Sequence, residues 1–445
     1  MEFLFLSLLI IPFVWILFLG LSFFSRLNLA ERFLSESSKW LSMIMSLLSL
    51  LLSIMVLLNR STPVSYDSFT WLSVGDYDFK IRFLVDLLGA TYALLSSLLI
   101  GIIFRFSRNY LHKEEGYFRF IFLLSTLLLG LMIVSFARSL DLIFAGWELV
   151  GTTSVLLIGY FYVQSQPVRH SLKAIVSYRF CDMGILAAAA WAHHYMHTTD
   201  FTTIPSLLHG SHLHEVGHGG PVALTFIGLF IIWAALAKSG QLPFSSWLPA
   251  AMEGPTPSSA IFYGALSVHL GPFLLLRFYD FFEHFPLLLW VIGSVGAISA
   301  LYASGVGRTR SDAKTMLAYA TISQVGIIWV EIALGFKQFA LFHIVAHASL
   351  RTWQYLRSAS LIQDFFENPV VQQNEKIQRN LSFEKWVSPS FRNRFYIHAL
   401  HGFHLDYFTS KILDGLSMPF RWFMDFERKW MALNNSIVKF IFQKR

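Results

Sequence analysis

Long apolar segments, separated by short polar ones, occupy most of the chain. A helix needs about 17–25 mostly apolar residues to cross a bilayer. Segments that approach this length lie near residues 3–24, 40–58, 83–105, 117–137, 139–163, 170–192, 222–238, 256–279, 285–304, 311–334 and 338–362. The pattern predicts an all-α polytopic membrane protein with about 11 transmembrane helices. The first segment lacks a basic start and a small-residue cleavage site, so we interpret it as a retained helix.

The composition agrees with a membrane protein. Hydrophobic residues make up 55% of the chain and charged residues 14%, whereas about a quarter of a soluble domain is charged. Cys181 is the single cysteine, which excludes a disulfide framework and a cysteine-based metal site. The net charge of +7 comes from loops and the tail, with no basic stripe interleaved with aromatic residues, so nucleic acid is excluded as a partner.

The distribution of basic residues predicts the orientation in the membrane. Lys and Arg are more frequent in the loops after the first, third, fifth, seventh and ninth predicted spans than in the opposite loops. Cytoplasmic loops carry such an excess, so we predict that the amino terminus lies outside. An odd number of spans then places the basic tail after residue 362 in the cytoplasm.

The predicted outside loop between the sixth and seventh spans is rich in histidine. Its histidines are His193, His194, His197, His209, His212, His214 and His218. Neutral imidazole binds transition metals, so a metal site is one interpretation. The spacing matches no zinc signature, which favours a polar surface loop. Both alternatives stay open from the sequence.

Residues 366–445 differ from the rest in being less hydrophobic. "FENPVVQQNEKIQRNLSFEKW" is typical of a polar connector. "LDYFTSKILDGLSMPFRWFMDFERKWMALNNSIVKFIF" mixes aromatic and charged residues at helical spacing, which predicts amphipathic cytoplasmic helices on the membrane surface or on a partner. The charges between residues 421 and 429 disfavour a twelfth span.

Two ionisable residues stand inside apolar segments, Glu148 in "FAGWELVGTTSVLLIGYF" and Lys238 in "FIIWAALAKSGQLPFSSWLPAAMEGPTP". Charges at this depth are costly, so they pair within the protein and mark ion or proton paths. Because Gly240 and Pro243 follow Lys238, the seventh span should be a broken helix, as in transporters. A lysine beside Glu148 would hold it ionised, so we predict a Glu148–Lys238 pair that protons can switch.

The last predicted span, "ALFHIVAHASLRTWQYLRSAS", places His343, His347 and Arg351 at i, i+4 and i+8, on one face of a helix. Imidazoles in a row can pass a proton from one nitrogen to the other, so we predict a proton relay. A single membrane histidine, by contrast, usually forms only a hydrogen bond to a neighbouring helix. Further candidates are Asp182, Glu331 and Lys314, although Lys314 is close enough to a helix end to snorkel.

Several stretches resemble the antiporter-like membrane subunits of complex I (chain 5, or subunit L), of Mrp antiporters and of two-component inorganic carbon transporters (DabB). The tail "NRFYIHALHGFHLDYFTSKILDG" resembles the end of the DabB subunit more than that of complex I chain 5. The stretches are "RFIFLLSTLLLGLMIVSFARSLDLIFAGWELVGTTSVLLIGYF", "AKSGQLPFSSWLPAAMEGPTPSSA", "DAKTMLAYATISQVG" and "ALFHIVAHASLR". They fall within about residues 83–362. The resemblance implies that this family's proton-translocating groups are present in the chain.

The resemblance assigns roles position by position. Proton-translocating roles fall on Glu148, Lys238, Asp182, His343, His347 and Lys314. Where the family has a histidine in the eighth span, this chain has Tyr263, and His269 follows six residues later. Where the family has a lysine in the eleventh span, this chain has Arg351, which acts as a fixed charge because it does not deprotonate. The route between the eighth and eleventh spans is therefore expected to differ.

The resemblance also implies a division into segments. We expect the first three spans in 1–110, the core repeat in 111–280, a partial second repeat in 281–365 and a partner-docking tail in 366–445. We expect an incomplete inverted repeat, because no second broken helix with a lysine is recognisable in 281–365.

The resemblance leaves several functions open. The first is proton conduction in an inorganic carbon uptake complex, with a large carbonic-anhydrase-like zinc subunit as cytoplasmic partner. The second is chain 5 of complex I, with other membrane subunits as partners. A Mrp-type antiporter component and an assembly factor are further alternatives. We expect no cofactor in this chain, and an inner membrane of a cell or of mitochondria as its location.

Overall fold

The computed structural model describes most of the chain. The described residues are 1–404, apart from residue 28 and the ranges 60–61, 75–76, 204–219 and 360–387, together with Tyr407, Lys411, Gly415, Met418, Trp422, Asp425 and Phe426.

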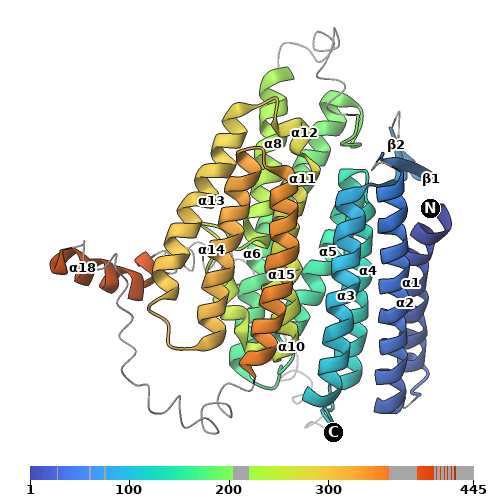
Figure 1. Cartoon of the computed structure of the whole chain (residues 1–445), viewed down its shortest axis with the longest axis horizontal. Coiled ribbons are helices and arrows are strands. Elements are labelled where there is room, and N and C mark those ends of the chain that lie inside the picture. Colours follow the sequence, from blue (N-terminus) through green and yellow to red (C-terminus); the bar gives the residue numbers. More distant parts are fainter. Residues whose placement is uncertain are drawn as a thin grey trace, which may run out of the picture.

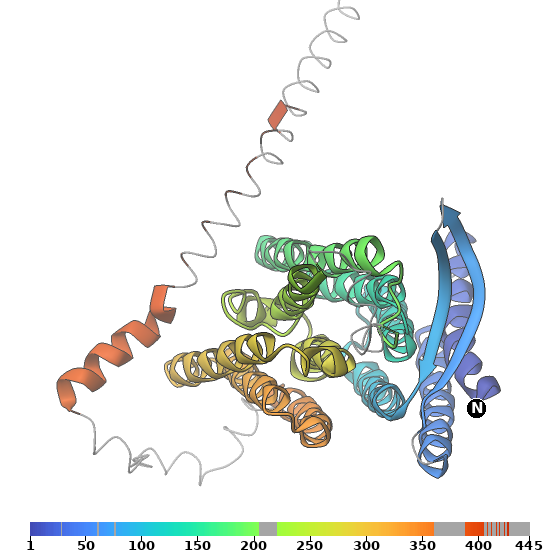
Figure 2. The same ribbon diagram turned by 90° about the horizontal axis from the view of Figure 1, so that it is seen from above.

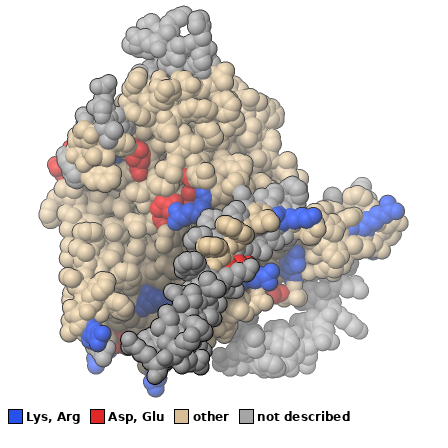
Figure 3. Space-filling model, turned by 180° about the vertical axis from the view of Figure 1, so that it is seen from behind, with Lys and Arg blue, Asp and Glu red and all other residues tan. Residues whose placement is uncertain are grey.

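Long helices run roughly parallel to one another through the molecule (Figure 1). They are α1 Glu2–Phe24, α2 Glu31–Leu58, α3 Leu87–Tyr110, α4 Tyr117–Phe136, α5 Leu140–Ile158, α6 Ser165–Met196, α8 Gly220–Lys238, α13 Pro286–Gly307, α14 Ala313–Ala333 and α15 Lys337–Ser358. Within the described residues, nine helical segments are long and apolar enough to span a membrane, and Val222–Lys238 is apolar but shorter. The face in Figure 3 is largely uncharged, with acidic and basic side chains in small groups. The prediction of an all-α polytopic membrane protein is confirmed.

The predicted break after Lys238 is present. Helix α8 ends at Lys238, Gly240 has a φ of +60°, and helical structure resumes only at α9 (Trp247–Ala250) and η2 (Ala251–Glu253). The Trp247 indole donates to the carbonyl of Ala237, 2.8 Å away, and so satisfies part of the backbone that the break leaves open.

The eighth span is irregular and lies at the centre of the protein. It consists of α10 (Thr256–Ser259), a π-helical turn η3 (Ala260–Ala265), η4 (Ser267–His269) and α11 (Leu270–Arg277), and its most apolar part is wholly buried. A short helix, α12 (Tyr279–Phe282), leads from it to α13. A π turn shifts the side chains that follow it around the helix axis, and such turns are frequent at functional sites.

A β-hairpin replaces part of the predicted loop between the second and third spans. Strands β1 (Val64–Val74) and β2 (Tyr77–Val85) pair antiparallel, and the hairpin lies beside the amino-terminal helices (Figure 2). Ring stacking of Phe5 on Tyr66 attaches it to α1. The predicted helix start at residue 83 is wrong because Asp86 caps α3 by accepting from the Gly89 amide, 2.8 Å away.

A second boundary also differs, since α5 ends at Ile158 and not at residue 163.

In the tail, α18 (Pro389–Leu400) and η6 (Gly402–His404) pack on α13, where Phe403 lies against Tyr302. Most of the predicted amphipathic segment after residue 404, and the histidines from 209 to 218, lie outside the described residues. The four-segment division stays a prediction.

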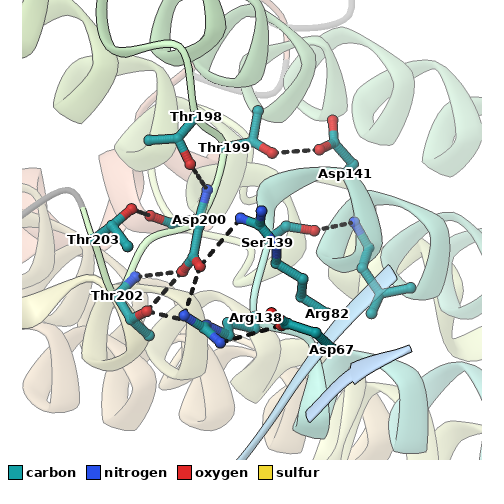
Figure 4. Close-up of polar contacts among 11 residues, drawn as sticks. Asp67, Arg82, Arg138, Ser139, Asp141, Thr198, Thr199, Asp200, Thr202 and Thr203 are labelled. Atoms are coloured by element: carbon teal, nitrogen blue, oxygen red, sulfur yellow. Dashed lines mark hydrogen bonds and ion pairs between the residues drawn. The ribbon is translucent and has the colours of Figure 1, made fainter. Parts of the chain in front are cut away.

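A buried carboxylate holds the hairpin to the α4–α5 connection and to the segment after α6 (Figure 4). Asp200 accepts from Arg138 at 2.9 Å and from Arg82 at 3.4 Å, and its other oxygen accepts from the Thr202 amide and hydroxyl. Arg138 also reaches Asp67 at 3.4 Å. The network fixes these three segments around one charge.

Candidate ion-translocation site

Lys238 lies at the end of α8 and is fully buried. Its ammonium donates to the Trp147 carbonyl, 3.3 Å away, and lies 4.4 Å from the centre of the Tyr178 ring and 5.1 Å from that of Trp147. Aromatic faces attract a cation and so replace part of the lost hydration. Gly151 provides the space, because a Cβ atom there would lie 2.7 Å from the ammonium nitrogen.

Glu148 does not pair with Lys238, so the predicted Glu148–Lys238 pair is wrong. Its carboxylate forms an ion pair with Arg179 of α6, which also donates to Thr152 at 3.3 Å. Successive residues of a helix point about 100° apart. Trp147 faces Lys238, so the side chain of Glu148 points away from the lysine, and in this direction it meets Arg179. The side chains of Glu148 and Arg179 are 19% and 48% exposed, so this pair lies near the edge of the helix bundle.

Asp182 is the acid that acts on Lys238. It is buried, accepts from the Trp147 indole at 2.6 Å, and interacts electrostatically with Lys238. Trp147 thus binds both groups, Lys238 through its carbonyl and Asp182 through its indole nitrogen. The sequence placed Asp182 among the candidates but did not indicate that it, and not Glu148, is the neighbour of Lys238.

The residues predicted on one face of α15 do share that face, but each meets a different partner. His343 Nδ1 lies 2.8 Å from a carboxylate oxygen of Glu331, and its Nε2 lies 3.2 Å from the Gln324 side-chain oxygen. Both partners come from α14. Glu331 therefore belongs to the site, and Gln324 is a member that the sequence analysis missed because nothing in its apolar surroundings singles it out.

His269 lies beside His347, with Nε2 and Nδ1 of the two rings 2.9 Å apart. The other nitrogen of His347 accepts from Arg351 at 3.1 Å. His347 must then donate from Nδ1, so His269 accepts at Nε2 and donates from Nδ1 to the Ala265 carbonyl. Arg351 thereby fixes the direction of this hydrogen-bond chain. The centres of the His343 and His347 rings are 6.1 Å apart.

The predicted Lys314, and Tyr263 at the position of the family's histidine, contact other groups. Lys314, at the start of α14, is half-buried and its ammonium lies 3.5 Å from the Gly254 carbonyl. Tyr263 points to the Ser154 carbonyl at 3.4 Å and does not contact His347 in any hydrogen bond of the described residues. In the eighth span it is therefore His269, and not Tyr263, that forms the hydrogen bond to His347 of α15.

The broken segment after Lys238 packs on α11, the helix that begins directly after His269. Ser239 packs against α11, where a Cβ atom at Gly271 would lie 1.8 Å from its hydroxyl oxygen. Within the described residues, the Ser239 hydroxyl and the Gln241 side-chain oxygen are buried without a hydrogen-bond partner. Buried polar atoms of this kind are suited to bind water.

The fold and these contacts define a polytopic membrane protein with a broken helix that ends in a buried lysine, flanked by buried ionisable groups. The chain belongs to the NADH:quinone oxidoreductase/Mrp antiporter transmembrane family, whose model matches residues 137–386. A model for the amino terminus of complex I chain 5 matches residues 71–121.

Curated relatives support this assignment. The chain is 31% identical to NAD(P)H-quinone oxidoreductase subunit 5 of the chloroplast of Mesostigma viride, over 75% of this chain and 51% of that protein. It is 31% identical to NADH-quinone oxidoreductase subunit L of Escherichia coli, over 68% of this chain and 49% of that protein. The chain therefore spans about half the length of these curated relatives.

Two solved structures share the fold. A chain of the Mrp complex from Dietzia sp. DQ12-45-1b superposes with a TM-score of 0.67 at 22% identity, covering 79% of this chain and 37% of that one. A chain of an archaeal membrane-bound sulfane sulfur reductase superposes with a TM-score of 0.69 at 16% identity, covering 92% and 85%. At these identities the likeness concerns the fold alone.

Proposed function

We propose that this protein is a proton-translocating membrane subunit of a larger complex of the NADH-quinone oxidoreductase or Mrp type. The observation that carries the proposal is the fully buried Lys238 at the end of the broken helix, bound by Trp147 beside Asp182. Membrane proteins keep ionisable groups at such a place for ion or proton movement, because an unused charge there only costs stability.

The proposed route runs from Glu331 and His343 to Lys238. Rotation of an imidazole passes a proton from His343 to His347, and His347 Nδ1 donates it to Nε2 of His269. His269 then releases a proton from its Nδ1 to water bound at Ser239, which carries it along the broken segment to Lys238. Trp147 binds both Lys238 and Asp182, so the acid stands beside the lysine at the end of the route.

The relatives favour the quinone oxidoreductase and Mrp types of complex over the inorganic carbon type. Those described above are named as quinone oxidoreductase subunits, and the Mrp complex provides a fold neighbour. These names support complex I chain 5 or a Mrp-type component over the inorganic carbon uptake complex expected first from the sequence. The partners are then other membrane subunits, and a carbonic-anhydrase-like zinc partner is the less supported alternative.

The proposed orientation follows the basic loops, with the amino terminus outside and the tail in the cytoplasm, in an inner membrane of a cell or of mitochondria. Because the native Cys181 is buried, single cysteines introduced at exposed positions report the orientation. A membrane-impermeant maleimide should label Thr62→Cys in intact cells and Gln164→Cys only after permeabilisation. The reverse labelling would contradict the orientation.

Proton flux tests the role of Lys238. Inverted membrane vesicles from cells that express the full chain with its partners should show proton movement that Lys238→Ala abolishes. Lys337→Ala is the matched control, because Lys337 is an exposed lysine at the start of α15 that pairs with Asp280. Flux at the wild-type level in Lys238→Ala vesicles that contain normal amounts of protein would refute the proposal.

Copurification tests the complex type. A many-subunit quinone oxidoreductase or small Mrp-type proteins should accompany the tagged chain out of mild detergent. Recovery with a single large zinc protein would instead establish the inorganic carbon alternative.

A further inference from the structure

An apolar groove runs between α3 and α15, which lie side by side and run in the same direction (Figure 1). Its volume is about 420 Å³, and leucine, isoleucine and valine side chains make most of its lining. Leu98 of α3 and Trp353 of α15, both in the lining, are 49% and 56% exposed. The groove therefore opens on the outer surface of the helix bundle, away from the buried ionisable groups.

The groove has the length of a lipid chain. Its lining extends from Thr91 to Ile102 on α3 and from Val345 to Leu356 on α15. Each stretch corresponds to a rise of about 16 Å, or roughly half the thickness of the hydrocarbon core. A hydrocarbon chain matches the length and the apolar lining of this groove.

One end of the groove is positively charged. Arg105 follows Ile102 by three residues, which places it on the same face of α3, one turn further along. Arg357 directly follows Leu356, and its guanidinium lies 5.5 Å from the centre of the Trp353 ring. Both arginines are exposed. They lie at the end of the two helices that the basic loops predict to be cytoplasmic, where anionic lipid headgroups are found.

We propose that this groove binds one acyl chain of an anionic phospholipid and that Arg105 and Arg357 bind its phosphate. The hydrocarbon chain fills the apolar space between α3 and α15, and the two guanidinium groups meet the headgroup at the membrane surface. The bound lipid packs on the side of α15 opposite His347 and holds this helix against α3.

Native mass spectrometry of the full chain, released from nanodiscs that contain equal amounts of dioleoyl phosphatidylglycerol and dioleoyl phosphatidylcholine, tests the proposal. One phosphatidylglycerol should remain bound in preference to phosphatidylcholine. In the Arg105→Gln/Arg357→Gln variant, the ratio of bound phosphatidylglycerol to bound phosphatidylcholine should fall about tenfold, since each basic residue near the surface attracts anionic lipid. Leu98→Trp, which fills the groove, should release the lipid while both arginines are retained.

The Arg169→Gln/Arg308→Gln variant is the matched control, because it removes two exposed arginines from the same predicted side of the membrane, away from the groove. It should keep the preference of the wild type. Equal retention of the two lipids, an equal loss in the control, or an unchanged lipid count in Leu98→Trp would each overturn the proposal. Displacement of the lipid by a copurifying subunit would also overturn it, because the groove would then belong to that partner.

Discussion

His269 and His347, which lie 78 residues apart in the sequence, face each other across the interior with 2.9 Å between Nε2 and Nδ1. His269 belongs to the irregular eighth span and His347 to the regular helix α15. Within the described part of the chain, no other hydrogen bond joins a titratable side chain of the eighth span to one of α15. It is the only place at which the proposed route passes directly from one imidazole to another.

Replacing His269 tests whether this contact carries protons. Glutamine keeps a donor and an acceptor in a similar place but cannot hold the proton that an imidazole passes on. We expect His269→Gln to lower proton flux in vesicles by at least about tenfold, with little change in thermal stability. His112→Gln, at an exposed histidine that pairs with Glu31, should leave the flux unchanged. Normal flux in His269→Gln would remove this histidine from the route.

We predict that Arg351 acts through His347 and does not itself carry protons. Its Nε donates to His347, and another guanidinium nitrogen donates to the Gln354 side chain at 2.7 Å. Lysine retains the charge but loses the forked geometry, whereas alanine loses both. We expect the proton flux to be highest in the wild type, lower in Arg351→Lys and lowest in Arg351→Ala. Equal loss in the two variants would show that charge is not what this position supplies.

The Glu148–Arg179 pair predicts non-additive effects on stability. Removing one partner leaves the other charge unpaired inside the membrane, whereas removing both leaves none. The unfolding midpoints of Glu148→Gln, Arg179→Gln and the double variant should give a coupling free energy of about 0.5–3 kcal/mol. Additive losses would indicate that the ion pair contributes nothing to stability.

Glu148 also has a predicted role in transport. Glu148→Gln should lower the proton flux independently of its effect on stability, because the neutral side chain cannot change charge when protons pass. If Glu148→Gln and Lys238→Ala both leave flux at the wild-type level, the relay hypothesis fails as a whole.

Asp200 should be important for stability. Its side chain is 1% exposed and accepts from two arginines, so Asp200→Ala leaves unpaired charge near the hairpin. We expect the free energy of unfolding to fall by about 3 kcal/mol. Asp67→Ala is the control, because that side chain is 64% exposed and an exposed ion pair such as the one with Arg138 is worth about 1 kcal/mol or less. Denaturant titration followed by tryptophan fluorescence measures both.

The sequence by itself determined the class of protein, the place of most helices and the break after Lys238. These features are local. A stretch of apolar residues spans the membrane wherever it packs, and Gly240 and Pro243 interrupt a helix by their own backbone restrictions. The alignment of His343, His347 and Arg351 on one face is also local, because it depends only on the helical repeat.

The tertiary structure alone decided which of these groups meet. The helical repeat gives the direction of Glu148 relative to Trp147, but not which helix lies in that direction, so the partner Arg179 was not predictable. The contact of His269 with His347 depends on the π turn that precedes His269 and on the position of α15 beside it. The hairpin at residues 64–85 was missed for the same reason, since its strands are stabilised by pairing with each other and by packing on α1.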